Sequence, residues 1–421
     1  MSSRVVELWE WGDGQTVDLT STEASTLRRV QASLQVTWLG PHQARIAPQG
    51  GTVGIVALSP DLTVVVRPRW PVRSLVELAA YALDLEVTPD LFREAAALAK
   101  DGPQDWLALF LALEIERLLA QGLRQGYREV DDDIPYVRGR IDFPRLALRG
   151  EIAGTLPCRF SDFILDTDEN RILRGTLELL AGSPLTEPAR RWVCRSLAAF
   201  RQVSLVFPSR ETFDRIRLDR LNVHYRPALE LCRMVVECLG LELSPGGVTG
   251  SSFFFPLATL FEKAVERALR EAFPGEHRRQ PIYSDRITVE GGPPHSVALR
   301  PDNVVGSWEE PWLVVDAKYK RPMTEYRDME RFLSDDLYQA FTYAVALGAP
   351  VVLVYPKVDE AVDAQLELTG YNVHVRTVDI GRQGVLALRE LADELAGNYD
   401  AQVTGAPRRR RAGPGGGKRG G

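Results

Sequence analysis

The sequence predicts a multidomain α+β protein, in which a small β-rich domain precedes a mostly helical middle region and a C-terminal α/β domain. Three observations support this prediction. Short apolar runs between turn residues fill about the first 70 residues, helical periodicity begins at Val72, and strand-like and helical segments alternate after residue 246. The length of 421 residues suits two or three domains. The expected divisions are 1–71, 72–245, 246–400 and a tail at 401–421.

The N-terminal domain is expected to be a small β barrel or sandwich. Turn residues such as Gly50-Gly51 and Ser59-Pro60-Asp61 separate its apolar runs, and short strands between regular turns are typical of such folds. The expected strands are Val5–Trp9, Gln35–Leu39, Thr52–Ala57 and Leu62–Pro68.

The middle region is expected to be mostly helical. Trp106, Phe110 and Ile115 contribute to a wide apolar face before about Gly126, and a short β-like stretch follows around Tyr136–Phe143. The turn-forming run Ser244-Pro245-Gly246-Gly247 marks the boundary to the next domain. The later helices of this region are expected near Glu169–Ala181, Pro188–Phe200 and Arg226–Leu239.

The C-terminal domain is expected to alternate helices and strands. A helix over about Leu257–Phe273 is stopped by Pro274-Gly275, and a second helix covers about Asp335–Leu347. Past Tyr399 the chain is rich in Arg, Gly and Pro and has no apolar core, so we expect disorder there. The expected strands are Ile282–Val289, Ser296–Val305, Trp312–Tyr319, Val351–Tyr355 and Asn372–Val378.

Composition excludes several classes of protein. No run of about 18 apolar residues is present, and the N-terminus has no basic start before an apolar core, so a cytoplasmic protein without a membrane span is expected. The four cysteines show no CxxC pair, which argues against a zinc knuckle. The net charge of −6 argues against a protein that coats DNA with its whole surface, although a local DNA contact remains compatible with it.

The chemically informative stretch is Arg300-Pro301-Asp302, followed fourteen residues later by Asp316-Ala317-Lys318. The β-branched run before Asp316 predicts a strand, and side chains two residues apart on a strand share a face. Asp316 and Lys318 should therefore lie on one face. A hairpin through Gly306–Pro311 would bring Asp302 beside them, so two carboxylates and an ammonium group would converge at one sheet edge.

This set of side chains suits phosphodiester hydrolysis with Mg²⁺, for which Mn²⁺ can substitute. Carboxylate oxygens of Asp302 and Asp316 are the hard ligands that Mg²⁺ prefers, and the metal lowers the pKa of an attacking water. Lys318 would position that water and stabilise the charge that develops on the phosphate.

Three more residues complete the predicted site. Glu262, on the helix that precedes the strands, is the expected third acid and metal ligand, and Glu266, one turn further on, is the alternative. Gln339 and Tyr343 are four residues apart on the second helix and share its face, so they could hold the lysine, the water or a DNA phosphate.

Ordinary structural explanations compete with these assignments. A single Asp-x-Lys is most often an exposed ion pair, and Gln339 and Tyr343 alone would be a surface amide and a packed aromatic ring. The apolar strand, the Pro-Asp at hairpin distance and the preceding acidic helix together favour a nuclease. Phe253-Phe254-Phe255 is expected in the core, the arginines at 408–411 in a solvated tail, and the five histidines have no ligand spacing.

These residues match the PD-(D/E)xK nuclease superfamily, and the sequence more narrowly resembles the McrC family, the nuclease subunits of McrBC-type modified-cytosine restriction systems. The resemblance covers most of the chain. It rests on segments in the order that the family uses, namely Val53–Val56, Val64–Pro68, Val137–Phe143, Cys158–Phe160, Asp166–Leu173, Leu260–Glu262, Arg300–Asp302, Asp316–Lys318 and Tyr338-Gln339.

The resemblance implies a division of labour in antiviral defence. McrC-like endonucleases join a ring of McrB-like AAA+ GTPase subunits through an N-terminal region, which here would be the β-rich domain of residues 1–71. They stimulate the GTPase of the ring and cut double-stranded DNA with modified cytosine. In agreement with this, the chain has no phosphate-binding P-loop, because Gly415–Arg419 lacks the GxxxxGK[ST] spacing. The nucleotide is therefore expected on the partner and not on this chain.

Two other functions remain open at this point. A stand-alone RecB-like DNA exonuclease would also carry a Gln-x-x-x-Tyr helix after its Asp-x-Lys. A catalytically idle adaptor would only activate an AAA+ ring. The long N-terminal portion argues against the first, and the presence of Asp302, Asp316 and Lys318 together argues against the second.

Overall fold

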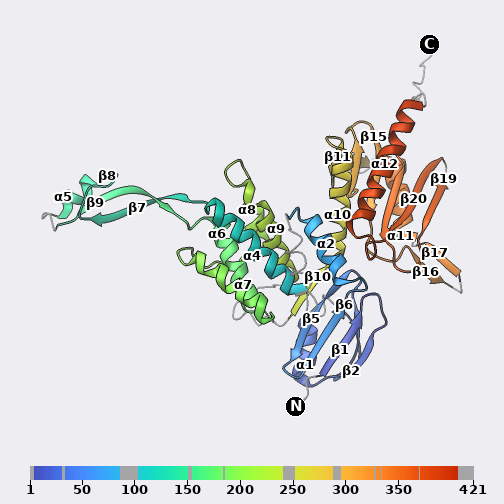
Figure 1. Ribbon diagram of the computed structural model, residues 1–421, viewed down its shortest axis with the longest axis horizontal. Helices are drawn as coiled ribbons and strands as arrows, with labels where there is room; N and C mark the ends of the chain where they lie inside the picture. Colours follow the sequence, from blue (N-terminus) through green and yellow to red (C-terminus); the bar gives the residue numbers. More distant parts are fainter. Residues whose placement is uncertain are drawn as a thin grey trace, which may run out of the picture. The chain divides into compact units, whose positions relative to one another are not determined.

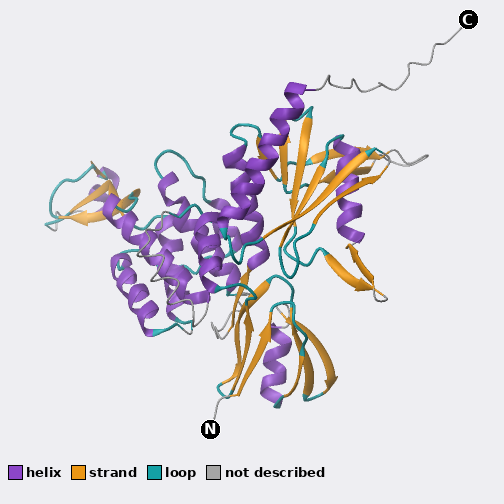
Figure 2. Ribbon diagram, turned by 45° about the vertical axis from the view of Figure 1, so that its right-hand side comes forward, coloured by secondary structure: helices purple, strands orange, loops and turns teal. Residues whose placement is uncertain are grey.

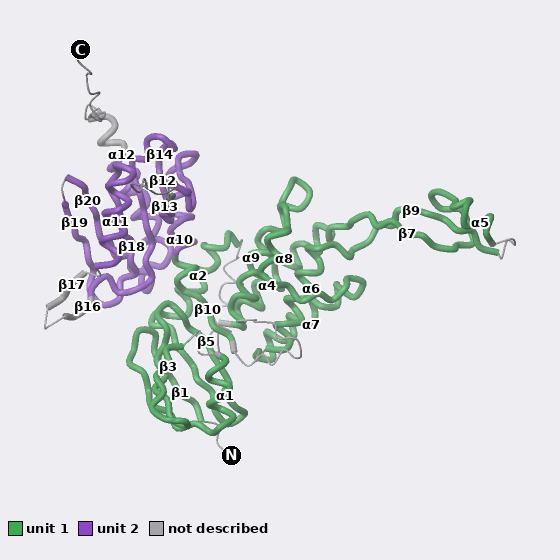
Figure 3. Tube along the Cα trace, turned by 180° about the vertical axis from the view of Figure 1, so that it is seen from behind, with its two compact units in different colours: residues 1–261 green, residues 262–421 purple. Residues whose placement is uncertain are grey.

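The computed structural model consists of two compact units, Met1–Phe261 and Glu262–Gly421 (Figure 3). The division falls inside a helix, whereas the sequence predicted it at Ser244–Gly247, which lies outside the described residues. The structure describes residues 4–30, 34–85, 103–149, 154–183, 185–239, 252–287, 295–326, 329–332, 334–368 and 370–405. No helix in these ranges is long and apolar enough to cross a membrane.

Unit 1 begins with two β-sheets and a helix that share one core. The first sheet has the strand order β1-β6-β5-β10 and the second the order β2-β4-β3. Helix α1 (Ser21–Val30) contacts β5, and side chains such as Leu27, Ile46 and Val64 are fully buried between the elements. The strands are β1 (Arg4–Trp9), β2 (Gln15–Asp18), β3 (Leu34–Gly40), β4 (Gln43–Pro48), β5 (Thr52–Ser59), β6 (Leu62–Arg67) and β10 (Ser252–Pro256).

Strand β10 belongs to unit 1, so the predicted limit between the middle region and the C-terminal domain was wrong. We expected residues from 246 onward in the C-terminal domain, but β10 pairs antiparallel with β5 in unit 1. Its Phe253, Phe254 and Phe255 are buried, as the sequence predicted, and Phe254 belongs to the core of the β-sheets. The backbones approach so closely that a Cβ at Gly54 would collide with the oxygen of Phe253, so glycine is required there.

The middle of unit 1 is helical, in agreement with the prediction. Helix α4 (Pro103–Gln121) contacts α6, α7 and α9, and it buries Leu107, Phe110, Leu111 and Ile115 completely. The other helices are α2 (Val72–Ala82), α6 (Asp168–Ala181), α7 (Glu187–Leu197), η2 (Ala198–Phe200), α8 (Arg210–Arg215), η3 (Val223–Tyr225) and α9 (Arg226–Cys238).

A two-stranded arm projects from these helices (Figure 1). Strands β7 (Gly126–Ile134) and β9 (Leu156–Ile164) pair along their whole length, and β8 (Arg140–Ile141) and α5 (Phe143–Arg149) lie towards its far end. The sequence predicted only a short β-like stretch at Tyr136–Phe143. It missed β7 because this strand carries three successive aspartates and has no apolar face, so pairing with β9 rather than burial holds it extended.

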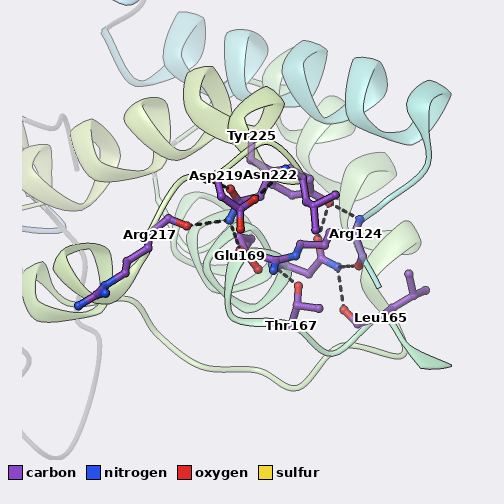
Figure 4. Close-up of polar contacts among 10 residues, drawn as sticks. Arg124, Leu165, Thr167, Glu169, Arg217, Asp219, Asn222 and Tyr225 are labelled. Atoms are coloured by element: carbon purple, nitrogen blue, oxygen red, sulfur yellow. Dashed lines mark hydrogen bonds and ion pairs between the residues drawn. The ribbon is translucent and has the colours of Figure 1, made fainter. Parts of the chain in front are cut away.

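The two ends of the arm are joined by a buried polar network (Figure 4). The side-chain amide of Asn170 donates hydrogen bonds to the backbone oxygens of Arg124 and Leu165, over 2.9 and 2.7 Å. Tyr225 donates to Asn170 Oδ1 at 3.0 Å and accepts from the Arg124 amide at 2.7 Å. Glu169 pairs with Arg124 and accepts from Asn222. One fully buried asparagine therefore binds both ends of the arm.

Unit 2 is an α/β sandwich around a six-stranded sheet of order β11-β14-β15-β18-β20-β19 (Figure 2). Strands β15, β18 and β20 are parallel, whereas β14 and β15 form an antiparallel hairpin. The strands are β11 (His277–Arg279), β14 (Asn303–Gly306), β15 (Pro311–Ala317), β18 (Val351–Pro356), β19 (Asp363–Leu368) and β20 (Tyr371–Val378), with the separate pairs β12 (Tyr283–Ile287)/β13 (His295–Leu299) and β16 (Met323–Tyr326)/β17 (Met329–Phe332).

Helices cover both faces of this sheet. Helix α11 (Ser334–Leu347) packs on the face that carries Val314 and Leu353. Helices α10 (Leu257–Ala272) and α12 (Val385–Gly405) lie on the opposite face. They line a common space with Val315 and Val354, which follow Val314 and Leu353 in their strands and point to the other side of the sheet. Helix α12 continues to Gly405, so residues 401–405, which we expected to be disordered, are helical; residues 406–421 lie outside the described ranges.

Candidate active site

Asp302 lies against the end of β15, next to Asp316. The sequence predicted one strand over Ser296–Val305, but the structure divides it into β13 and β14, and Asp302 lies in the break. The amide of Ala317 donates to Asp302 Oδ2 at 3.1 Å, and the Asp302 backbone oxygen accepts from the Gln280 amide at 2.8 Å. The β14–β15 hairpin therefore brings the two acids together, as its length predicted.

Asp316 and Lys318 lie on one face of β15 and its extension. Lys318 Nζ is 2.6 Å from Asp316 Oδ2, and the Lys318 amide continues the sheet by donating to Val354 at 2.8 Å. Asp316 is only 2% exposed. Within the described part of the chain, its Oδ2 has this ion pair but no hydrogen bond of normal geometry. A buried carboxylate oxygen is thus left with spare capacity to accept.

Helix α11 holds the lysine through a chain of three hydrogen bonds. Lys318 Nζ donates to Gln339 Oε1 at 2.9 Å, Gln339 Nε2 donates to Tyr343 OH at 2.9 Å, and Tyr343 OH donates to the Arg300 oxygen at 3.2 Å. This series of hydrogen bonds ends at Arg300, two residues before Asp302. Of the roles that the sequence allowed for Gln339, this geometry supports holding the lysine.

Glu262, rather than its alternative Glu266, faces the cluster. Glu266 is occupied by Arg270 and Arg279, at 3.4 and 3.0 Å. Glu262 is half-buried, and its charge acts on Asp302. However, the described side chains form no group of three or more Asp, Glu, His or Cys arranged to hold a metal ion. The geometry therefore supports Asp302 and Asp316 as the ligand pair, and leaves Glu262 beside them.

The pKa values reflect negative charge concentrated away from water. Burial raises the pKa of Asp302 to about 7, and the charges of Asp316 and Glu262 add to the increase. Burial also raises the pKa of Glu262. For Lys318, burial lowers the pKa, but the carboxylates around it, Asp316 above all, outweigh this effect and leave the pKa raised. Lys318 is therefore a cation at neutral pH.

A divalent cation suits these residues. The donors are carboxylate oxygens, one of them buried and short of hydrogen bonds. Burial raises the pKa of Asp302, and the charges of Asp316 and Glu262 raise it further, although Lys318 acts in the opposite direction. Mg²⁺ is commonly bound through one or two protein carboxylates while it keeps several waters. A pair of aspartates therefore fits Mg²⁺ without a third protein ligand.

A second set of polar side chains, which the sequence did not predict, lies beside the cluster. Lys320 Nζ is 2.8 Å from Asp336 Oδ1, and Tyr355 OH donates to Asp336 Oδ2 at 2.7 Å. Two signals were present in the sequence. Lys320 continues the every-second-residue pattern of Asp316 and Lys318, and Asp336 lies one helical turn before Gln339.

The sequence and the fold are similar to those of known proteins. Residues 48–356 match the family described as McrBC 5-methylcytosine restriction system component. The chain is 25% identical over 348 residues to the type IV methyl-directed restriction enzyme EcoKMcrBC of Escherichia coli (strain K12), covering 78% of this chain and 97% of that protein. A solved chain from an assembly of Thermococcus gammatolerans McrB AAA+ hexamers with bound McrC has a similar fold, with a TM-score of 0.57, 16% identity and coverage of 93% of this chain and 100% of that one.

Proposed function

The chain belongs to the family of McrBC 5-methylcytosine restriction system components, and from this premise we propose that it is the Mg²⁺-dependent DNA endonuclease subunit of such a system. The observation that carries the proposal is the cluster of Asp302, Asp316 and Lys318 at the end of β15, with the pKa of Asp302 raised to about 7. A structural ion pair would need only one carboxylate for the lysine. Two carboxylates, with a third beside them, create an excess of negative charge that a metal ion would balance.

Asp302 and Asp316 would hold the metal, which would supply a water of lowered pKa and neutralise charge on the scissile phosphate. Lys318 is charged at neutral pH, so in this mechanism it is an electrostatic group and not the resting general base. Its ammonium group has three donors, of which Asp316 and Gln339 engage two. The third can bind the attacking water or a phosphate oxygen.

Gln339 and Tyr343 act in this mechanism by fixing the direction of the Lys318 side chain. The four rotatable bonds of a lysine would otherwise let the ammonium group leave the cluster. Because Tyr343 is buried and bonded to the Arg300 oxygen, the chain of hydrogen bonds links the lysine to the segment that carries Asp302. Catalytic groups from two parts of the sheet are thereby kept in register.

The proposed partner is an AAA+ GTPase ring of the McrB type, and the proposed substrate is double-stranded DNA with modified cytosine. The solved structure of similar fold from T. gammatolerans is described as an assembly of McrB AAA+ hexamers with bound McrC. The sequence has no phosphate-binding loop, so nucleotide hydrolysis is assigned to the partner. We assign partner binding to unit 1. Its arm exposes aromatic rings, including the neighbouring pair Tyr127 and Phe163, whose centroids are 4.9 Å apart and whose planes are tilted by 42°.

The test is cleavage of a plasmid containing 5-methylcytosine by the full chain with its AAA+ partner, GTP and Mg²⁺. Asp302→Asn and Asp316→Asn should each reduce cutting at least a hundredfold while GTP hydrolysis by the partner continues. The matched control is Asp363→Asn, a carboxylate on the edge strand β19 of the same sheet, whose exposed side chain pairs only loosely with Arg376 at 3.5 Å. Cutting at the wild-type rate by both site variants would refute the proposal.

A further inference from the structure

Lys320 is a second cation on the face that carries the catalytic residues. Tyr319 is buried between the partly exposed Lys318 and Lys320, so the alternation of β15 continues past its last paired residue. Asp316, Lys318 and Lys320 thus follow one another on the α11 side, where Gln339 and Asp336 of that helix bind the two lysines. Lys320 pairs with Asp336 and not with Asp316, so its ammonium group lies beside the catalytic cluster.

The carboxylate that holds Lys320 is itself fixed. Asp336 is 4% exposed, and each of its oxygens has a partner, Lys320 at 2.8 Å and Tyr355 at 2.7 Å. Tyr355 is fully buried on β18, so the direction of the carboxylate is set by the core. The charge of Asp336 also acts on Lys318, which indicates that the two lysines share one electrostatic environment.

The outer end of Lys320 is free to bind a further group. Its side chain is 42% exposed, compared with 20% for Lys318, so water or a ligand can reach the ammonium group. An ammonium group has three donors, and Asp336 engages one of them. A buried carboxylate that fixes one donor of a half-exposed lysine leaves the other two donors available to bind an anion.

We propose that Lys320 binds a backbone phosphate of the DNA strand next to the one that is cut, with Asp336 and Tyr355 as its positioning residues. This inference rests on the proposed nuclease function and adds a substrate contact to it. Contacts to phosphates fix the register of DNA on a protein without reading its sequence. Lys318 would then act on the reacting phosphate while Lys320 holds the strand beside it.

The variant that tests this is Lys320→Gln, which removes the charge but keeps a hydrogen-bond donor for Asp336, with Lys320→Arg as the rescue. Initial cleavage rates are measured against plasmid concentration at several KCl concentrations, with the full chain, its partner, GTP and Mg²⁺. Lys320→Gln should raise KM about tenfold, since charge-assisted hydrogen bonds are the strong ones. It should leave kcat within about twofold and reduce the slope of log KM against log salt by about 1. Lys320→Arg should restore both quantities.

Two further variants separate this role from charge loss and from misfolding. Lys357→Ala removes a lysine of comparable exposure that follows the neighbouring strand β18 and pairs with Asp379 at 3.5 Å; it should change neither KM nor the salt slope. The double variant Lys320→Gln/Asp336→Asn leaves no buried charge unpaired. Its thermal unfolding midpoint should therefore match that of the wild type, while its KM should stay as high as that of Lys320→Gln.

The outcomes distinguish this inference from the function on which it rests. Absence of cleavage by the wild-type chain would overturn the proposed function itself. Normal cleavage by the wild type with an unchanged KM and salt slope in Lys320→Gln would overturn only the phosphate contact. A fall in kcat without a change in KM, or an equal effect of Lys357→Ala, would also overturn it.

Discussion

The backbone amide of Ala317 donates a hydrogen bond to the carboxylate of Asp302 over 3.1 Å, across fourteen intervening residues. This bond favours the ionised form of Asp302, yet burial and the charges of Asp316 and Glu262 outweigh it and raise the pKa to about 7. The same hairpin that assembles the site therefore also brings together groups that repel one another.

The pH dependence of stability should report this repulsion in the metal-free protein. Because the folded-state pKa of Asp302 lies above the unfolded value near 3.9, the group favours folding below about pH 4 and loses this contribution as the pH rises through about 7. Asp302→Asn should then increase the free energy of unfolding at pH 8 by an amount on the order of 1–2 kcal/mol. The gain should vanish near pH 4. Urea unfolding across this pH range measures it, and a pH-independent gain would contradict the assignment.

Binding of Mg²⁺ should release protons near neutral pH. Asp302 is partly protonated there and must ionise to act as a ligand. Calorimetric titration of the full chain with MgCl₂ at pH 7, in two buffers of different ionisation enthalpy, should give different apparent heats. Asp302→Asn should abolish that difference. Equal heats for the wild-type protein in both buffers would contradict a protonated Asp302.

Gln339→Ala should lower kcat about tenfold and leave KM nearly unchanged, because it removes one charge-assisted hydrogen bond that directs Lys318. Thr342→Ala on the same helix is the control, since that exposed hydroxyl bonds the Tyr338 oxygen within its own helix. Plasmid cleavage kinetics measure both variants. Equal kcat values for the two variants would show that the lysine needs no support from α11.

Asn170→Ala should destabilise unit 1 by about 2–4 kcal/mol, because it leaves partly buried backbone oxygens at both ends of the arm without their donor and removes the buried acceptor of Tyr225. Gln365→Ala, which removes an exposed amide bonded to Asn372 at 3.3 Å, should cost less than about 0.5 kcal/mol. Urea unfolding of the two variants provides the comparison. Similar losses would mean that the network contributes little.

A fragment of residues 1–261 should stimulate GTP hydrolysis by the AAA+ partner and cut no DNA. A fragment of residues 1–245 should be less stable, because it lacks β10 and exposes the apolar side chains that Phe254 covers. Thermal unfolding and the GTPase assay compare the two fragments. If stimulation of the GTPase required residues 262–405, the assignment of the partner surface to unit 1 would be wrong.

The sequence predicted those elements whose pattern is local. The apolar run Leu313–Val315 indicates a buried strand, and its alternation places Asp316 and Lys318 on one face without knowledge of the fold. The pairing of β10 with β5 could not be predicted, because it joins segments about 200 residues apart and neither segment identifies the other. Strand β7 was missed because its acidic sequence has no apolar periodicity. Asp336 reads as an ordinary N-terminal helix acid until Tyr355 and Lys320 are seen beside it.

The hydrogen bonds of Asn170 hold the first and last residues of the arm next to each other, so the arm has the geometry of an insertion. Because Arg124 and Leu165 are bound by the same side-chain amide, the polypeptide leaves the helical region and returns to it at the same place. The entropy of closing such an excursion grows only slowly with its length. Changes in the length of the arm should therefore leave the helices beneath it intact, and the length can vary independently of the site at Asp302 and Asp316.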